Sequence, residues 1–142
     1  MARSPLTLAA TVTSALPRVV VTGVGSLSEG TSGRYDSAIA ELDDGRRVVV
    51  RVPVDDGADA DLVAEARALH SLTAGVRGVL PFGAPDVLGE TRVDGRLALV
   101  QTLLPGYRVD AAHVPAGRGI ATALATATAQ VHDLPVTVVR DA

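Results

Sequence analysis

Arg51 and Glu65 are the two residues whose types and positions best suit a functional site. Arg51 interrupts a run of β-branched residues over 48–52, a composition that favours a strand covered on both faces. A guanidinium in such a strand needs an anion beside it, because an unpaired buried charge is costly. Glu65 follows Leu62 by three residues and precedes Leu69 by four, so a helix here places its carboxylate on the apolar face. The residues alone leave two interpretations open, a structural ion pair or a cation that binds an anionic ligand.

A second candidate is the segment 23–33, which is rich in glycine, serine and threonine. Its glycines allow a ligand to approach the backbone closely, and its N–H and hydroxyl groups suit phosphate oxygens. The spacing matches neither G-x-G-x-x-G nor a Walker loop, because Ser28 stands at the third glycine position and no lysine follows. Taken alone, the segment is either a plain hairpin loop or a phosphate-binding loop.

Several kinds of chemistry are excluded by residues that the sequence lacks. All 13 basic residues are arginine, and there is no cysteine. Mechanisms that need an amine or a thiolate, including a Schiff base and a thiolate zinc site, are therefore absent. The histidines share no zinc-ligand spacing, and the acidic segment 55–61 lacks the glycine and glutamate of a calcium loop. We predict no metal ligand in this sequence.

The composition is that of one compact domain with an aliphatic core. The chain has 142 residues, of which 47% are hydrophobic and only 2% aromatic. A net charge of −3 argues against nucleic acid as a partner. The N-terminus has no signal-peptide core, and no apolar run reaches the length of a membrane span. We therefore expect a cytoplasmic protein without a membrane partner.

Periodicity and turn residues predict an α+β domain. We expect a five-stranded antiparallel sheet with one packed helix, plus an N-terminal and a C-terminal helix. Two tight hairpin turns are predicted, at 43–45 and at 93–95, where Asp and Gly accept positive φ angles. The expected elements are a helix over 5–16 capped by Ser4, strands over 19–24, 36–42 and 45–53, a helix over 59–72 capped by Asp59, a loop over 73–86, strands over 87–92 and 96–102, and a helix over 117–132.

Four segments stand in a fixed order and spacing along the chain: Leu27-Ser28-Glu29-Gly30, Val48-Val49-Val50-Arg51-Val52-Pro53, Glu65-Ala66-Arg67-Ala68-Leu69 and Val131-His132-Asp133-Leu134-Pro135. Together they resemble the N-terminal lobe of aminoglycoside and macrolide phosphotransferases. These are kinase-fold antibiotic-resistance enzymes related to choline kinases, and the resemblance covers nearly all of residues 4–140. It implies a protein-kinase-like small lobe that binds nucleotide over 1–106, followed over 107–142 by a connector and the first helix of a C-terminal lobe.

The resemblance implies a site for ATP or GTP. Arg51 stands where such kinases usually place a lysine on the phosphates, and Glu65 is its partner on the helix. Arginine keeps the charge but replaces a point charge with a planar fork. The loop residues expected over the phosphates are Ser26, Ser28, Gly30, Thr31 and Ser32. The hinge expected to bind the base through its backbone comprises Gln101, Leu103 and Leu104.

The resemblance also implies residues that these 142 positions do not contain. In such enzymes a catalytic loop with an aspartate base and an asparagine, then a magnesium-binding aspartate, follows the helix that is expected last here. His132-Asp133 and Arg140-Asp141 match this pattern only in part, so we predict no catalytic residue. Magnesium and the small-molecule substrate would be bound through a C-terminal lobe.

The predicted function is the nucleotide-binding lobe of a phosphotransferase. The enzyme would move the γ-phosphate of ATP or GTP to a hydroxyl of a small molecule such as an aminoglycoside or macrolide antibiotic. One alternative is a non-catalytic kinase-like binding or interaction module, and another is an unrelated α+β domain with a structural ion pair. Surfaces expected to face a second lobe would favour a homodimer when exposed; the candidates are Val52, Leu103, Leu104 and the Ile120/Leu124 helix face.

Overall fold

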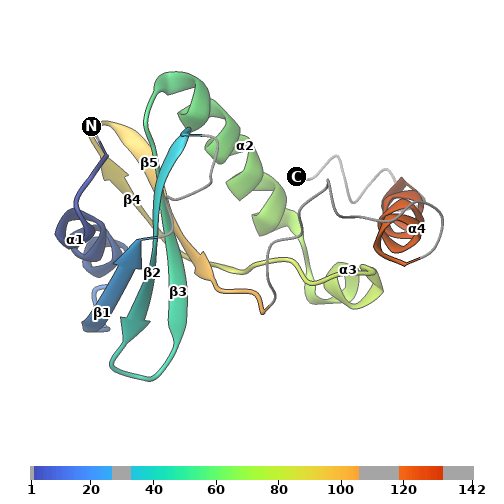
Figure 1. The fold of residues 1–142 in the computed structure, drawn as a ribbon, viewed down its shortest axis with the longest axis horizontal. Helices are drawn as coiled ribbons and strands as arrows, with labels where there is room; N and C mark the ends of the chain where they lie inside the picture. Colours follow the sequence, from blue (N-terminus) through green and yellow to red (C-terminus); the bar gives the residue numbers. More distant parts are fainter. Residues whose placement is uncertain (1, 27–32, 106–118, 133–142) are drawn as a thin grey trace.

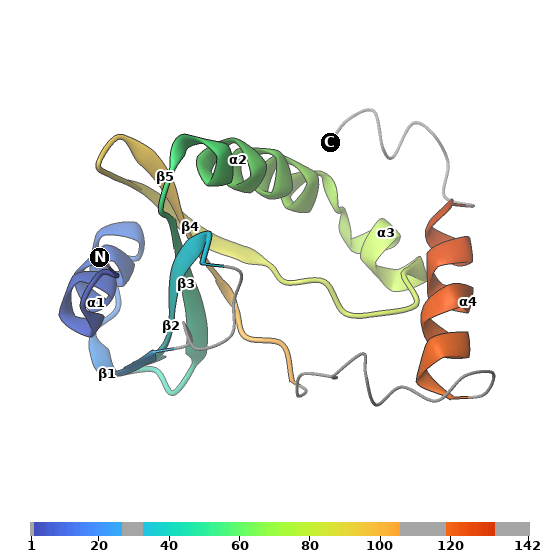
Figure 2. The same cartoon turned by 45° about the horizontal axis from the view of Figure 1, so that its top comes forward.

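The computed structural model describes residues 2–26, 33–105 and 119–132. The helices α1 and α2 lie on opposite faces of one sheet, and α4 lies away from it (Figure 1, Figure 2). The α+β class, the five-stranded antiparallel sheet and the two terminal helices are confirmed. In chain order the elements are α1 (Pro5–Ala15), β1 (Val21–Ser26), β2 (Tyr35–Leu42), β3 (Arg47–Pro53), α2 (Asp56–Ser71), α3 (Ala74–Val79), β4 (Val87–Val93), β5 (Arg96–Thr102) and α4 (Ile120–His132).

The sheet has the order β1-β2-β3-β5-β4, with every neighbouring pair antiparallel. Both predicted hairpin turns are present. Gly45 has φ +84° and donates its N–H to the Leu42 carbonyl at 3.0 Å. Asp94 and Gly95 have φ 52° and 80°, the two positive values that a type I′ turn requires. These turns set which residues of adjacent strands face each other.

One side of the sheet, here called the α1 face, carries the main aliphatic core. Leu8 and Val12 of α1 pack there against Val48, Val50 and Val52 of β3, and all five are buried. Ser4 caps the helix as predicted, since its hydroxyl accepts a hydrogen bond from the N–H of Thr7. Val52 is fully buried, so the prediction that it belongs to an exposed lobe-facing surface is wrong. Successive side chains of a strand point to opposite faces, so Val52 lies on the α1 face while its neighbour Arg51 lies on the other face.

The other side, here called the α2 face, carries a smaller core in which Leu62 and Ala66 of α2 pack against Leu97 and Leu99 of β5. The helix begins three residues earlier than the sequence predicts. Its N-cap is Asp55, which accepts a hydrogen bond from the N–H of Ala58 at 2.7 Å. The predicted cap, Asp59, instead accepts from the backbone N–H of Leu97 at 2.7 Å. A carboxylate in the first turn thus anchors α2 to β5.

Other predicted boundaries differ from the structure by a few residues. The segment 73–86, expected to be a loop, contains the short helix α3, which Thr73 caps by accepting from the N–H of Val76. The first strand begins at Val21 rather than at residue 19, and α4 begins at Ile120 rather than at residue 117. These ends depend on local hydrogen bonds that apolar periodicity does not report.

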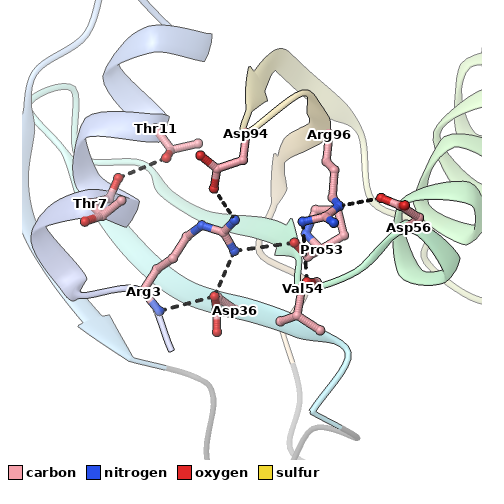
Figure 3. A network of polar contacts seen from close by, with 9 residues as sticks. All are labelled: Arg3, Thr7, Thr11, Asp36, Pro53, Val54, Asp56, Asp94 and Arg96. Atoms are coloured by element: carbon pink, nitrogen blue, oxygen red, sulfur yellow. Dashed lines mark hydrogen bonds and ion pairs between the residues drawn. The ribbon is translucent and has the colours of Figure 1, made fainter. Parts of the chain in front are cut away.

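Two arginines hold the junction between β3 and α2 (Figure 3). Arg3 donates to the Asp36 carboxylate at 3.0 Å and to the Pro53 carbonyl at 3.4 Å. Arg96 donates to the Asp56 carboxylate, in the first turn of α2, at 2.9 Å. The end of the strand and the start of the helix are therefore tied to the N-terminus and to β5. This junction positions the strand and the helix that carry the candidate site.

Candidate functional site

The candidate site lies on the α2 face, where alternate residues of the strands point. Arg51 lies opposite Ser37 of β2 and Leu99 of β5. One step along β3, Val49 lies opposite Ile39 and Gln101. Ile39, Val49 and Arg51 are half-buried, whereas the α1-face residues of β3 are fully buried. This part of the α2 face is thus only partly covered by the helix.

The predicted contact between Arg51 and Glu65 is present. Arg51 Nη1 donates to Glu65 Oε1 at 2.6 Å, which joins the middle of β3 to the middle of α2. The Arg51 side chain is 19% exposed and that of Glu65 is 40% exposed. The pair is therefore only partly buried, because Glu65 lies at the edge of the buried helix face formed by Leu62 and Ala66.

Tyr35 is a third member of the site that the sequence prediction missed. The Arg51 guanidinium carbon lies 4.5 Å from the centre of the Tyr35 ring, within the range of a cation–π contact. The Tyr35 hydroxyl donates to the Ala58 carbonyl in the first turn of α2 at 3.3 Å. The signal was available, because the turn at 43–45 places Ser37 opposite Arg51, and Tyr35 follows on the same face of the strand.

Most hydrogen-bond donors of Arg51 have no protein acceptor among the described residues. A guanidinium carries five N–H donors, and the structure gives Arg51 one hydrogen bond, to Glu65. Arg3, which has a similar exposure of 15%, donates to two carboxylates and a backbone carbonyl. Arg51 is therefore held in place by Glu65 and Tyr35 while retaining donors for a further anion.

An open recess of about 350 Å³ lies on the same face; Ile39, which pairs with Val49, lines it, and Arg51 does not. Gly23 and Gly25 contribute no side chain to it, and a Cβ added at Gly25 would meet no atom within 4 Å. Neither glycine has a positive φ, so the backbone does not require glycine there. The recess exists because these positions lack side chains. Its lining residues are Gly23, Val24, Gly25, Ile39, Glu41 and Arg47.

The loop residues predicted to cover phosphates are placed only in part. Ser26 is the last residue of β1 and pairs with Ala38, which in turn pairs with Val50. The last residue of β1 is therefore in register with Val50, the residue before Arg51 in β3. Beyond the loop, Arg34 pairs with Asp61 of α2, and this hydrogen bond raises the pKa of the Arg34 guanidinium. Four of the predicted residues, Ser28, Gly30, Thr31 and Ser32, lie outside the described residues.

The predicted hinge follows the Arg51 site along β5. Gln101 lies opposite Val49, and its Oε1 atom is buried without a hydrogen-bond partner among the described residues. Leu103 is half-buried and Leu104 is 42% exposed, both directly after the strand. The structure thus brings Arg51, Glu65 and Gln101 to one face, with the two leucines at its edge.

Across residues 2–26, 33–105 and 119–132, no group of three acidic or histidine side chains is arranged to hold a metal ion. In these ranges no helix combines the length and apolarity needed to cross a bilayer.

Fold and site together define the class of protein. An α+β domain with a five-stranded antiparallel sheet and an Arg–Glu contact between β3 and α2 is consistent with a kinase-like small lobe. The chain is similar to the solved structure of a macrolide 2′-phosphotransferase type I, with 26% sequence identity and a TM-score of 0.58. The match covers 99% of this chain and 48% of that chain, so this chain spans about half of its length. This supports a relationship to the phosphotransferase family. No protein-family model and no curated protein matches the chain.

Proposed function

We propose that this chain is the nucleotide-binding lobe of a phosphotransferase that moves a γ-phosphate from ATP or GTP to a hydroxyl of a small molecule. In this proposal residues 1–106 form the lobe and 107–142 lead to a C-terminal lobe. The observation that carries it is the half-buried Arg51 guanidinium, which Glu65 holds and which keeps further donors on the sheet face that also carries an open recess. A related macrolide phosphotransferase fold supports the class of reaction and a macrolide-like substrate.

Arg51 would bind the phosphate oxygens. Charge-assisted hydrogen bonds from a guanidinium to phosphate are short and strong, and its planar fork can donate two in parallel. Glu65 and Tyr35 hold the fork from two sides, so little side-chain entropy is lost when the phosphate binds. Ser26 and the loop residues Ser28, Gly30, Thr31 and Ser32 would supply further donors around the phosphates.

The base would lie against the neighbouring apolar row of the sheet. Gly25, Ile39 and Val49 stand side by side on three adjacent strands, one step along from Arg51. A flat ring can pack on this row, with the recess at Gly23 and Gly25 giving it room. Gln101, Leu103 and Leu104 would then contact the ring edge from the end of β5.

The described residues contribute positioning and charge neutralisation rather than proton transfer. Holding the nucleotide in one geometry and stabilising its phosphate charge are the main demands of phosphoryl transfer. The described part of the chain offers no carboxylate cluster for magnesium. In this proposal the metal ligands, the catalytic base and the substrate site belong to a C-terminal lobe, as the resemblance to phosphotransferases implies.

The test is a calorimetric titration of the chain with ATP and with GTP, each with magnesium. We expect Arg51→Ala to weaken binding at least about tenfold, because it removes hydrogen bonds to a charged group. Arg92→Ala, at an exposed position of β4, is the matched control and should bind like wild type. Absence of binding by wild type at millimolar nucleotide, or equal binding by Arg51→Ala, would refute the proposal.

We also propose that the protein is cytoplasmic and that it forms a homodimer. Exposed apolar side chains near the hinge favour self-association; Phe82 is 49% and Leu104 is 42% exposed, and Leu124 of α4 is 61% exposed. Sedimentation of wild type and of Phe82→Ser over a range of concentrations tests the homodimer. A concentration-independent monomer would exclude it.

A further inference from the structure

The guanidinium of Arg77, in α3, has protein hydrogen-bond acceptors for nearly all of its N–H donors. Its side chain is 23% exposed, and it contacts four backbone carbonyls and one carboxylate. This contrasts with Arg51, which has one acceptor among the described residues. The contacts are Nε to the Leu72 carbonyl at 3.2 Å, Nη1 to Ala84 at 2.9 Å, Nη2 to Leu69 at 3.4 Å and to Pro85 at 3.2 Å, and Nη2 to Asp86 Oδ1 at 3.3 Å.

Two of these acceptors belong to the C-terminal end of α2. The last carbonyls of a helix have no partner within the helix, and a nearby arginine can satisfy them. Arg77 does this for the C-cap residue Leu72, and it adds a second donor to the Leu69 carbonyl, which also accepts the N–H of Leu72. Glu65 precedes Leu69 by one helical turn. Arg77 therefore fixes the end of the helix that carries the partner of Arg51.

The other acceptors belong to the segment that leads into β4 and touches the end of β5. Asp86 donates its N–H to the Thr102 hydroxyl at 2.9 Å, and Thr102 donates its N–H to the Asp86 carbonyl at 3.0 Å. Thr102 stands between Gln101 and Leu103, two of the residues assigned to the base. Arg77 is thus connected through Asp86 to Thr102, in the part of β5 that leads into the predicted hinge.

We propose that Arg77 is a positioning residue that couples the two ends of the nucleotide site, the Arg51–Glu65 contact and the hinge. A planar fork with five donors can join two carbonyls of α2 to the segment 84–86, whereas a lysine has three donors on a single atom. The inference rests on the proposed nucleotide site, but the linkage itself is a property of the protein without ligand.

The experiment compares Arg77→Ala, Arg77→Lys and the matched control Arg67→Ala, an exposed arginine on α2. Two quantities are measured, nucleotide affinity and hydrogen exchange of the Thr102 and Leu72 amides. Exchange of core amides in β2 and β3 is recorded as well, so that affinity is compared between samples that are equally folded. We expect Arg77→Ala to lose at least about fivefold in affinity and to exchange faster at both amides. Arg77→Lys should restore neither the nucleotide affinity nor the slow exchange of the two amides. Arg67→Ala should match wild type in both.

The outcomes separate this inference from the proposed function. Unchanged exchange at Thr102 in Arg77→Ala, or full rescue by Arg77→Lys, would overturn the positioning role. If wild type binds no nucleotide, the proposed function fails, and the exchange data still decide whether Arg77 links α2 to the end of β5. Should Arg77→Ala not fold, Arg77→Lys decides the question, since it keeps the charge and loses the fork.

Discussion

Glu65 holds Arg51 through a hydrogen bond of 2.6 Å while 40% of its own side chain remains exposed. This combination changes the expected energetics of the pair. A fully buried pair loses about 3–5 kcal/mol when one partner is removed, because the other charge is left without compensation in the interior. A partly exposed pair contributes about 1 kcal/mol or less, since water solvates the remaining charge. Its role is therefore better explained by the orientation of Arg51 than by stability.

Glu65→Ala should accordingly lower the free energy of unfolding by only about 1 kcal/mol. Nucleotide affinity should fall as well, since Arg51 would lose the contact that orients it. Glu65→Gln is the control, because it keeps a hydrogen-bond acceptor without the charge. Its free energy of unfolding and its nucleotide affinity should lie between those of wild type and Glu65→Ala. Urea denaturation of the three proteins measures the effect. A loss above about 3 kcal/mol would show that the pair is buried after all.

Gly25→Val should separate folding from binding. A Cβ at this position meets no atom within 4 Å, and valine suits a strand better than glycine, so stability should stay equal or rise by about 0.5–1 kcal/mol. The same side chain fills the recess, and nucleotide affinity should fall about tenfold. Thr22→Val, which changes the same strand outside the recess lining, is the control. Undiminished affinity in Gly25→Val would exclude this recess as the base site.

Gln101→Leu should stabilise the protein in the absence of ligand. The Gln101 Oε1 atom is buried without a partner among the described residues, and such an atom costs about 1–3 kcal/mol. Replacing it with an apolar group of similar size should raise the free energy of unfolding by about 1 kcal/mol. Gln130→Leu, on the exposed surface of α4, should show no such gain. A clear destabilisation of Gln101→Leu would mean that the amide is satisfied in solution.

The β2–β3 hairpin should show a pH-dependent contribution to stability. A hydrogen bond from the Arg46 side chain holds the pKa of Asp44 below its ordinary value of 3.8. A carboxyl with a lowered folded-state pKa stabilises the fold above its unfolded-state pKa, and the effect disappears as the pH falls through the folded-state pKa. Asp44→Asn should therefore melt below wild type at pH 7, and the difference should shrink below about pH 4. A difference that is constant with pH would contradict this assignment.

Features that depend on nearby residues could be predicted from the sequence. The turns at Gly45 and Gly95 follow from residues that accept positive φ, and the Ser4 cap follows from its position before Pro5. The Arg51–Glu65 contact also belongs here, because strand alternation and helical spacing each place one partner on the shared face. Local rules therefore found both the class of fold and the central pair.

Features that depend on tertiary contacts were missed or misplaced. Asp55 and Asp59 are equally good caps in isolation, and the backbone N–H of Leu97 decides between them by engaging Asp59. Arg77 could be recognised only once its acceptors, which come from five residues within 69–86, were assembled around it. The exposure of Glu65 likewise depends on how α2 tilts over the sheet, which spacing does not report.

The most direct test of the account is a nucleotide titration followed by amide chemical shifts in two-dimensional NMR spectra. We expect ATP or GTP with magnesium to shift the amide signals of Gly25, Val49, Arg51 and Gln101, while the signal of Leu8, on the α1 face, stays in place. Shifts confined to the α1 side of the sheet, or no shifts at millimolar nucleotide, would contradict a nucleotide site at Arg51.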